Sequence, residues 1–535
     1  MLPMIFLGIY KGADLSQHAQ FSVTFYNNFV SGGIYPGWAA EDNLGYGSIG
    51  VRVYPPLTAF LFAFARLLVG DWHSATWLVL FLFTAIGAIG AYLWAKEFLS
   101  APDSIWAGII FIFTPYHIYQ IYNASQYAEF AGCSVITFSF LFVTRICKRG
   151  NLLDILGLAV AFSVLVLTHL PSTVIGAICL LLYSLMMIDK TRLIATLSKL
   201  SLAVFLALCA SSVYWIKVIT EMSLLRMLRF HNNNDFDYFA NFLLTAPWFD
   251  KRQLWFINFI FIVLIAFTLS AVFILFAKKG LKDKKILVSI SAVLSFALFM
   301  CTVLSKPIWM IVPYLADTQF PWRWLTIVSV TISVLLATAI EPIRELIKAK
   351  KIIKNGTKFF AFSLFACLLI IFMLFWTEFQ LNHIPKNNYE AWVWEKSTEM
   401  GCDYLWTAAA KESAFTITQK VLVAERQTNI STWQPTERVF SVEAGNATEA
   451  RIATLYYPHW QATVNNQPVK LKAADDGAIS IALPPERAII RIWFEEPLQI
   501  KTTLYISISM WILFGLTFLF ANARYRAKTI ALKTL

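Results

Sequence analysis

The sequence predicts a multi-spanning α-helical membrane protein with a small β-rich domain near its C-terminus. Of its 535 residues, 58% are hydrophobic and 14% are charged, whereas a soluble domain carries about 25% charged residues. The mean hydropathy is +0.61, and a water-soluble fold cannot cover this much apolar surface. The composition therefore excludes a soluble enzyme, a secreted disulfide-rich scaffold and a disordered protein.

Apolar runs of about 20 residues, the length that crosses a bilayer as a helix, recur along the chain. They lie at 75–95, 105–122, 127–146, 152–169, 172–188, 193–216, 255–277, 286–304, 324–341, 359–377 and 502–521. Met1–Tyr10 reads as a shortened further span, since it lacks the basic start and cleavage site of a signal peptide. We therefore predict about 12 transmembrane helices, with residues 57–70 too short to cross and lying at the outer surface.

The net charge of +12 comes largely from basic clusters in short loops and in the C-terminal tail. These clusters, among them Lys148–Arg149 and Lys278–Lys285, recur after every second apolar run, which is the positive-inside pattern. The charge therefore indicates membrane orientation and no nucleic-acid partner. It places both termini in the cytoplasm and residues 11–74 in a large first outer loop.

Residues 378–501 differ from the rest of the chain. Alternating stretches such as Ala488–Phe494 and 415–418, separated by turn residues as in Val464–Val469, are typical of strands and hairpins. We predict a transmembrane domain over 1–377, an extracytoplasmic β-sandwich-like domain over 378–501, and a last helix with a basic tail over 502–535. The seven cysteines contain no CxxC pair, so we expect neither a disulfide framework nor a zinc site.

The first outer loop carries a candidate acid–base pair. Asp14 and His18 are four residues apart and share a face if this segment is helical. Asp14 could act as a general base toward an acceptor hydroxyl, with His18 orienting it. The alternative is structural, because Asp14 and Gln17 also fit a helix N-cap and its capping-box partner.

Further polar residues interrupt or flank the apolar runs on the same side. Glu129 follows Gln126 by one helical turn, and an isolated carboxylate at membrane depth needs a partner or an aqueous cavity. His169 precedes a helix that begins with a proline, where a structural turn is the simpler interpretation. Tyr54, in Tyr54-Pro-Pro-Leu57, offers a flat face to a sugar or to lipid headgroups.

The stretch Gln319-Phe-Pro-Trp322-Arg323 is the most informative one. Arg323 lies at the outer end of a span between two tryptophans, and an arginine can bind a phosphate through two donors. The alternative is an arginine that snorkels to the interface. That alternative gives no reason for the Gln-Phe-Pro sequence before it.

These motifs resemble a family of bacterial membrane proteins described as 6-pyruvoyl-tetrahydropterin synthase-related. The resemblance rests on Gly12-Ala-Asp14 with His18, Tyr54–Leu57, Tyr127-Ala-Glu129 and Gln319–Arg323. The C-terminal segment Leu455–Trp460 is similar to YfhO-like membrane proteins, and both groups resemble the GT-C glycosyltransferase fold. The pterin label does not transfer as an activity, since the seven histidines are scattered.

The resemblance implies transfer of a sugar from a polyprenyl-phosphate donor to a lipid or glycan acceptor, on the outer face of the bacterial inner membrane. It implies Asp14 as base with His18 and Glu129 in support, and Arg323 with Gln319 on the donor phosphate. Tyr54, Gln126, His169 and Trp322 are further candidate substrate contacts. We expect no cofactor, with a metal ion left open. The alternatives are a transporter of lipid-linked glycans or a non-catalytic protein of envelope assembly.

Overall fold

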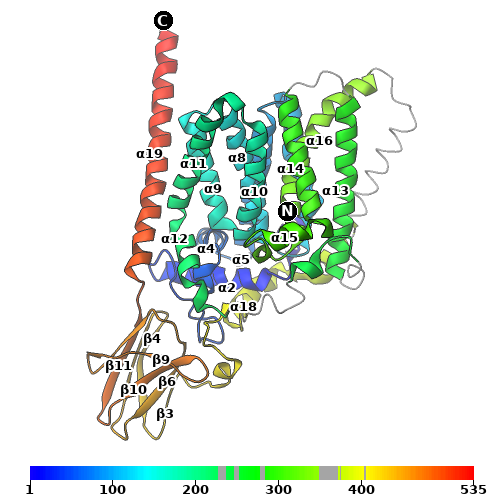
Figure 1. Cartoon of the computed structure of the whole chain (residues 1–535). Coiled ribbons are helices and arrows are strands. Elements are labelled where there is room, and N and C mark those ends of the chain that lie inside the picture. Colours follow the sequence, from blue (N-terminus) through cyan, green and yellow to red (C-terminus); the bar gives the residue numbers. More distant parts are fainter. Residues whose placement is uncertain are drawn as a thin grey trace.

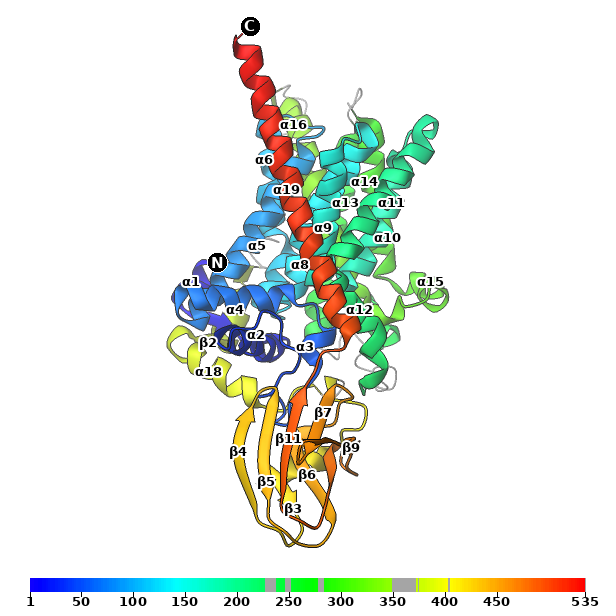
Figure 2. The same cartoon turned by 90° about the vertical axis from the view of Figure 1, so that its left-hand side faces the viewer.

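The computed structural model describes all residues except 227–236, 246–251, 278–282, 349–371, 374, 403–404 and 535. A bundle of long helices carries a β-sandwich at one end, which we call the sandwich end, and the helix α19 runs along the side of the bundle (Figures 1 and 2). The predicted fold class, mainly α-helical with a C-terminal β-region, is confirmed.

The long helices follow the predicted apolar runs. They are α5 (Trp72–Ala95), α8 (Tyr127–Lys148), α9 (Leu152–Thr168), α10 (Leu170–Met187), α11 (Leu193–Ala210), α13 (Arg252–Ala277), α14 (Lys284–Met300), α16 (Leu325–Lys348) and α19 (Leu498–Thr534). Within the described residues, seven helical stretches are long and apolar enough to cross a membrane, and α4 (Leu57–Val69) and α9 are shorter apolar helices. Most of the predicted span 359–377 lies outside the described residues.

Two predicted spans are each divided into two helices. The first breaks at Thr114, whose extended backbone separates α6 (Ala101–Phe113) from α7 (Pro115–Tyr122), because a residue before proline avoids the helical region. The second breaks at Ser211, between α11 and α12 (Ser212–Glu221).

The N-terminal segment does not form the predicted span. It forms a five-residue helix, α1 (Leu2–Phe6), and a strand, β1 (Gly8–Tyr10), which pairs antiparallel with β2 (His383–Pro385). The prediction that both termini lie on one side is consequently wrong, because the N-terminal strand lies toward the sandwich end while α19 carries the C-terminus to the opposite end (Figures 1 and 2). This pairing could not be predicted from the sequence, because a ten-residue apolar segment carries no signal for a strand partner near residue 384.

Several shorter helices cover the sandwich end of the bundle. The helices α2 (Leu15–Val30) and α4 lie across the direction of the long helices (Figure 2), as expected for a surface segment at 57–70. The helix α18 (Lys386–Thr398) packs against α2 and is fixed by Glu390, which accepts hydrogen bonds from Arg66 at 2.8 Å and from the backbone of Trp72 at 2.7 Å. The remaining short helices are α3 (Gly50–Val53), η1 (Lys190–Arg192), η2 (Met222–Leu224), η4 (Tyr238–Asn241), η6 (Val303–Ser305), α15 (Lys306–Ile311), η7 (Ala316–Thr318), η8 (Pro321–Trp324) and η10 (Glu412–Thr416).

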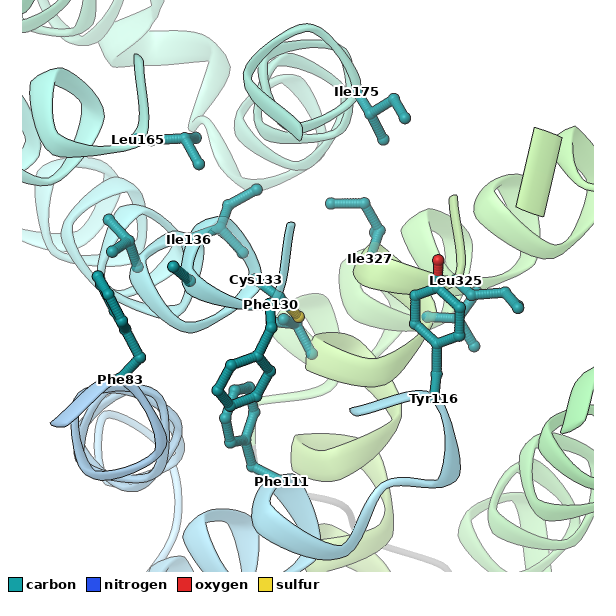
Figure 3. Packing of buried hydrophobic residues seen from close by; sticks show 14 of the residues in the cluster. Phe83, Phe111, Tyr116, Phe130, Cys133, Ile136, Leu165, Ile175, Leu325 and Ile327 are labelled. Carbon is teal, nitrogen blue, oxygen red and sulfur yellow. The ribbon is translucent and has the colours of Figure 1, made fainter. Parts of the chain in front are cut away.

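The bundle core is built from aromatic and aliphatic side chains of α5, α6, α8, α10 and α16 (Figure 3). Phe83 of α5, Phe111 of α6 and Phe130 of α8 all belong to this core, with the rings of Phe111 and Phe130 drawn close together in Figure 3. Helices α5 and α8 approach closely at Gly90, where a Cβ atom would overlap Thr137, and Gly87 leaves room for Phe111 of α6. Small residues at helix contacts are a usual device of membrane bundles, where close packing replaces the hydrophobic effect.

The C-terminal domain is a sandwich of two antiparallel sheets with a buried apolar core between them. One sheet has the order β3 (Val421–Val423), β6 (Thr448–Leu455), β10 (Ala478–Leu483), β9 (Lys472–Ala473). The other has the order β4 (Thr428–Gln434), β5 (Glu437–Val442), β11 (Ala488–Phe494), β7 (Trp460–Val464), β8 (Gln467–Pro468). Residues 415–418, expected as a strand, instead form the end of η10 and the two residues after it, without strand pairing, whereas 488–494 forms β11 as predicted.

Candidate functional site

Side chains from five elements gather at the sandwich end of the bundle. Asp14 precedes α2, Tyr54 follows α3, and Glu129 lies in the first turn of α8. His169 forms the turn between α9 and α10, and Arg323 lies in η8 just before α16. Each residue therefore stands at an element boundary, where loops can present side chains to a ligand.

Arg323 is held on two sides. Its Nε lies 3.3 Å from Glu129 Oε2, and one Nη donates to the carbonyl of Thr318 at 2.8 Å. The guanidinium lies over the ring of Phe320 at 5.0 Å, and Phe320 stacks on Trp322 at 4.3 Å. The other Nη makes no hydrogen bond with a described residue, so the fixed guanidinium keeps donors for a ligand.

Glu129 accepts hydrogen bonds at one oxygen and lies within ion-pair distance of Arg323 at the other. Its Oε1 accepts hydrogen bonds from Tyr116 at 2.7 Å, Gln120 at 3.1 Å and Thr326 at 3.1 Å. Its Oε2 faces Arg323, and the side chain is only 2% exposed. A carboxylate so placed is suited to anchoring Arg323.

Asp14 stands at the N-cap position of α2, but its side chain makes no capping hydrogen bond. The capping box with Gln17, the structural alternative, is therefore not formed. The Asp14 carboxylate has no hydrogen bond or ion pair with a described residue. Burial raises its pKa to about 6, with nearby Arg323 lowering and Glu129 further raising that value.

Tyr54 completes this group of charged and polar side chains. Its ring packs against Phe21 at 4.9 Å between centroids. Its phenol lies within electrostatic reach of Asp14, Arg323 and Glu129, and burial raises its pKa above the ordinary value. The phenol therefore remains a neutral hydrogen-bonding group.

His18 faces a different environment from Asp14. Its ring stacks on Tyr127 at 5.2 Å and lines a small cavity together with Trp72. Its Nε2 has no described partner, and burial lowers its pKa to about 4. The imidazole is therefore neutral near pH 7, and no described contact joins it to Asp14.

The other predicted contacts flank the group. His169 caps α10, its Nδ1 accepting from the backbone of Ser172 at 3.3 Å, and it lies within electrostatic reach of Arg323. Gln126 is the N-cap residue of α8, and its buried Oε1 has no described partner. Gln319 has a left-handed backbone, with φ of 67°, and its side chain makes no hydrogen bond with a described residue.

Sequence reasoning missed the residues that hold Glu129. Tyr116 and Gln120 are four residues apart on α7, and Thr326 follows Arg323 by three residues. The helical spacing was a signal for a shared face, but nothing local indicated that the faces meet at Glu129. No group of histidine, cysteine and acidic residues in the described parts of the chain could hold a metal ion.

The bundle and its polar group define the class, a multi-spanning membrane protein with a cluster of ionisable residues at one end. Residues 51–384 match the family described as "6-pyruvoyl-tetrahydropterin synthase related domain; membrane protein". This match covers more than half of the chain, and the protein belongs to that family.

Among solved structures, the chain is similar to ArnT from Cupriavidus metallidurans bound to undecaprenyl phosphate, with 13% identity and a TM-score of 0.42. The aligned region covers 63% of this chain and 56% of the ArnT chain. The apo structure of the same ArnT matches with 13% identity and a TM-score of 0.38, over the same 63% and 56% of the two chains. No curated protein sequence matches this chain.

Proposed function

We propose that the protein is a membrane glycosyltransferase that moves a sugar from a polyprenyl-phosphate donor to a lipid or glycan acceptor. The observation that carries the proposal is that Arg323 lies within electrostatic reach of Asp14. Among the described residues the Asp14 carboxylate has no hydrogen-bond or ion-pair partner, and the fixed Arg323 guanidinium keeps donors for a ligand. A base and a preorganised phosphate-binding cation are the two groups that such a displacement requires.

In the proposed reaction the acceptor hydroxyl attacks the anomeric carbon of the donor sugar. The bond from that carbon to the phosphate oxygen breaks, and its electron pair leaves with the polyprenyl phosphate. Asp14 accepts the proton of the acceptor hydroxyl, and one displacement inverts the anomeric configuration. Because the pKa of Asp14 is about 6, the carboxylate is ionised at neutral pH while remaining a competent base.

The remaining residues have supporting roles in this proposal. Arg323 binds the donor phosphate and stabilises the charge that develops on it, and Glu129 holds Arg323 in place. Gln319, Trp322 and Tyr54 contact donor or acceptor. His18 is neutral and directed to its own cavity, so we assign it no proton transfer; Gln126 and His169 line the approach.

Charge distribution supports an outward-facing site. Basic loop residues lie at the end of the bundle opposite the sandwich, where Arg145 pairs with Glu97 at 2.5 Å and Lys285 donates to the carbonyl of Ile188 at 2.8 Å. Positively charged loops favour the cytoplasm. We therefore propose that the sandwich end, with Asp14 and Arg323, faces outward from the inner membrane.

The test uses the protein in lipid nanodiscs with undecaprenyl phosphate as the probe, followed by native mass spectrometry. Wild type should bind the lipid, Arg323→Met should bind it at least tenfold more weakly, and Asp14→Asn should bind it nearly as well. Arg491→Met is the control, because Arg491 lies on the sandwich surface, paired with Glu437 at 2.7 Å. Equal binding by wild type and Arg323→Met would contradict the assignment of Arg323 to the donor phosphate. Release of the lipid coupled to its export would favour the alternative function, a transporter.

A further inference from the structure

A second group of charged residues lies where the first loop, the bundle and the sandwich meet. We call it the Arg52 cluster, and it comprises the charged residues Arg52, Glu221, Glu496 and Lys217 together with the backbone of Gly37. Arg52 belongs to α3, Glu221 ends α12, and Glu496 follows β11. Arg52 is separated from the two glutamates by 169 and 444 positions in the chain.

All five N–H donors of Arg52 are used. Nε and Nη2 donate to the two oxygens of Glu221 at 2.6 and 2.7 Å. Nη1 and Nη2 donate to the two oxygens of Glu496 at 2.5 and 2.9 Å, and Nη1 also donates to the carbonyl of Gly37 at 3.1 Å. The side chain of Arg52 is fully buried. Lysine has three donors and no planar fork, so it cannot reproduce this set of bonds.

The sandwich contributes more than one contact to the cluster. Tyr457 donates to Glu221 at 2.8 Å, and the Arg52 guanidinium lies over the rings of Tyr457 and Phe494 at 5.8 and 5.5 Å. One arginine and two glutamates carry a net negative charge. Lys217, buried over the ring of Tyr35 at 3.6 Å, supplies a compensating positive charge when protonated.

The fit around Gly37 leaves no spare space. A Cβ atom there would lie 2.7 Å from Glu496 Oε1 and 2.8 Å from the ring of Phe494. Both of these side chains belong to the sandwich side of the junction, and Arg52 prevents Glu496 from moving aside. Gly37→Ala therefore places a methyl group between the first loop and the sandwich, and it removes no charge.

The cluster also adjoins the candidate site. Arg52 is two residues before Tyr54, and the intervening Val53 carbonyl accepts a hydrogen bond from Tyr214 at 3.1 Å. Beyond the cluster, the backbone of Leu455 in β6 donates to the carbonyl of Tyr46 at 2.9 Å. The sandwich is thus bonded to the same loop that carries Tyr54 into the site.

We propose that Arg52 is a positioning residue that fixes the β-sandwich on the first loop and thereby holds Tyr54 beside Asp14 and Arg323. The sandwich is then part of the catalytic unit and not a tethered accessory domain. The placement of Tyr54 in a working site rests on the proposed function, whereas the fixing of the sandwich does not.

The first measurement is backbone hydrogen exchange of the full protein in detergent, followed at residues 50–54 and at Leu455. Arg52→Lys and Gly37→Ala should each speed exchange of these amides at least tenfold while the long helices stay protected. Gly401→Ala is the matched control, since its added Cβ would lie 3.4 Å from Gln20 in ordinary contact. Unchanged exchange in both variants would overturn the proposal.

The second measurement is binding of undecaprenyl phosphate by the same variants in nanodiscs. Arg52→Lys and Gly37→Ala should weaken binding to about the same extent as Tyr54→Ala, several-fold, with Gly401→Ala like wild type. Faster exchange with unchanged binding would overturn the positioning role. If wild type binds no lipid, the proposed function fails, while the exchange measurement still decides whether Arg52 fixes the sandwich.

Discussion

The ion pair between Glu129 and Arg323 gives a direct test of how the candidate site is held together. Replacing Arg323 with methionine keeps much of the side-chain volume and removes the charge. Glu129, 2% exposed, then loses the only cation within ion-pair distance among the described residues. Its three neutral donors, Tyr116, Gln120 and Thr326, remain.

The expected cost follows from these contacts. Breaking a buried ion pair by removing one partner costs about 3–5 kcal/mol, because the other charge stays buried. Since three hydrogen bonds to Glu129 persist, we expect the lower end, about 3 kcal/mol. Glu129→Gln in the same chain removes the stranded charge, so the double variant should lose only about 1 kcal/mol relative to wild type.

The assay is unfolding of wild type, both single variants and the double variant in mixed micelles of increasing SDS content. The double variant should unfold at higher SDS than Arg323→Met, because Glu129→Gln recovers about 2 kcal/mol in the Arg323→Met background. If Arg323→Met and the double variant unfold together, Glu129 carries no buried charge that depends on Arg323, and the reasoning is refuted.

Three further predictions follow from the same structure. Asp14→Asn should reduce sugar transfer at least 100-fold, and the wild-type rate should rise as pH increases through about 6, where Asp14 ionises; a flat pH–rate profile would count against Asp14 as base. Burial lowers the pKa of Lys217 from 10.5 to about 7. Between these two pH values the unfolded chain binds more protons than the folded protein. The unfolding free energy of wild type should therefore rise by about 2–3 kcal/mol from pH 7 to pH 9. Denaturation of Lys217→Met at the two pH values should lack that rise, and an unchanged rise would assign it to another group. Gly90→Ala should destabilise the bundle by about 1–3 kcal/mol because its methyl group overlaps Thr137, whereas Gly515→Ala, with no heavy atom within 4 Å, should not; equal thermal melting of the two variants would contradict the close packing of α5 on α8.

Much of the candidate site could be predicted because it rests on local patterns. Asp14 and Arg323 were recognisable as polar residues at the ends of apolar runs, where ionisable groups are costly without a function. Their proximity to each other was not predictable, since it depends on how α2 and α16 are placed by the bundle. The capping role for Asp14 and the orienting role for His18 were reasonable on spacing, but the fold turns the two side chains into different surroundings.

The sequence by itself determined the membrane class, most of the long helices, the β-rich character of the C-terminal region and the family. These features depend on composition and on hydrophobic periodicity over ten to twenty residues, which are local. Only the tertiary structure decided that Gly8–Tyr10 pairs with His383–Pro385, that Glu129 holds Arg323, and that Arg52 joins Glu221 to Glu496. Such contacts join residues more than a hundred positions apart, and their partners are selected by the packing of the whole chain, which leaves no periodic signal in either segment.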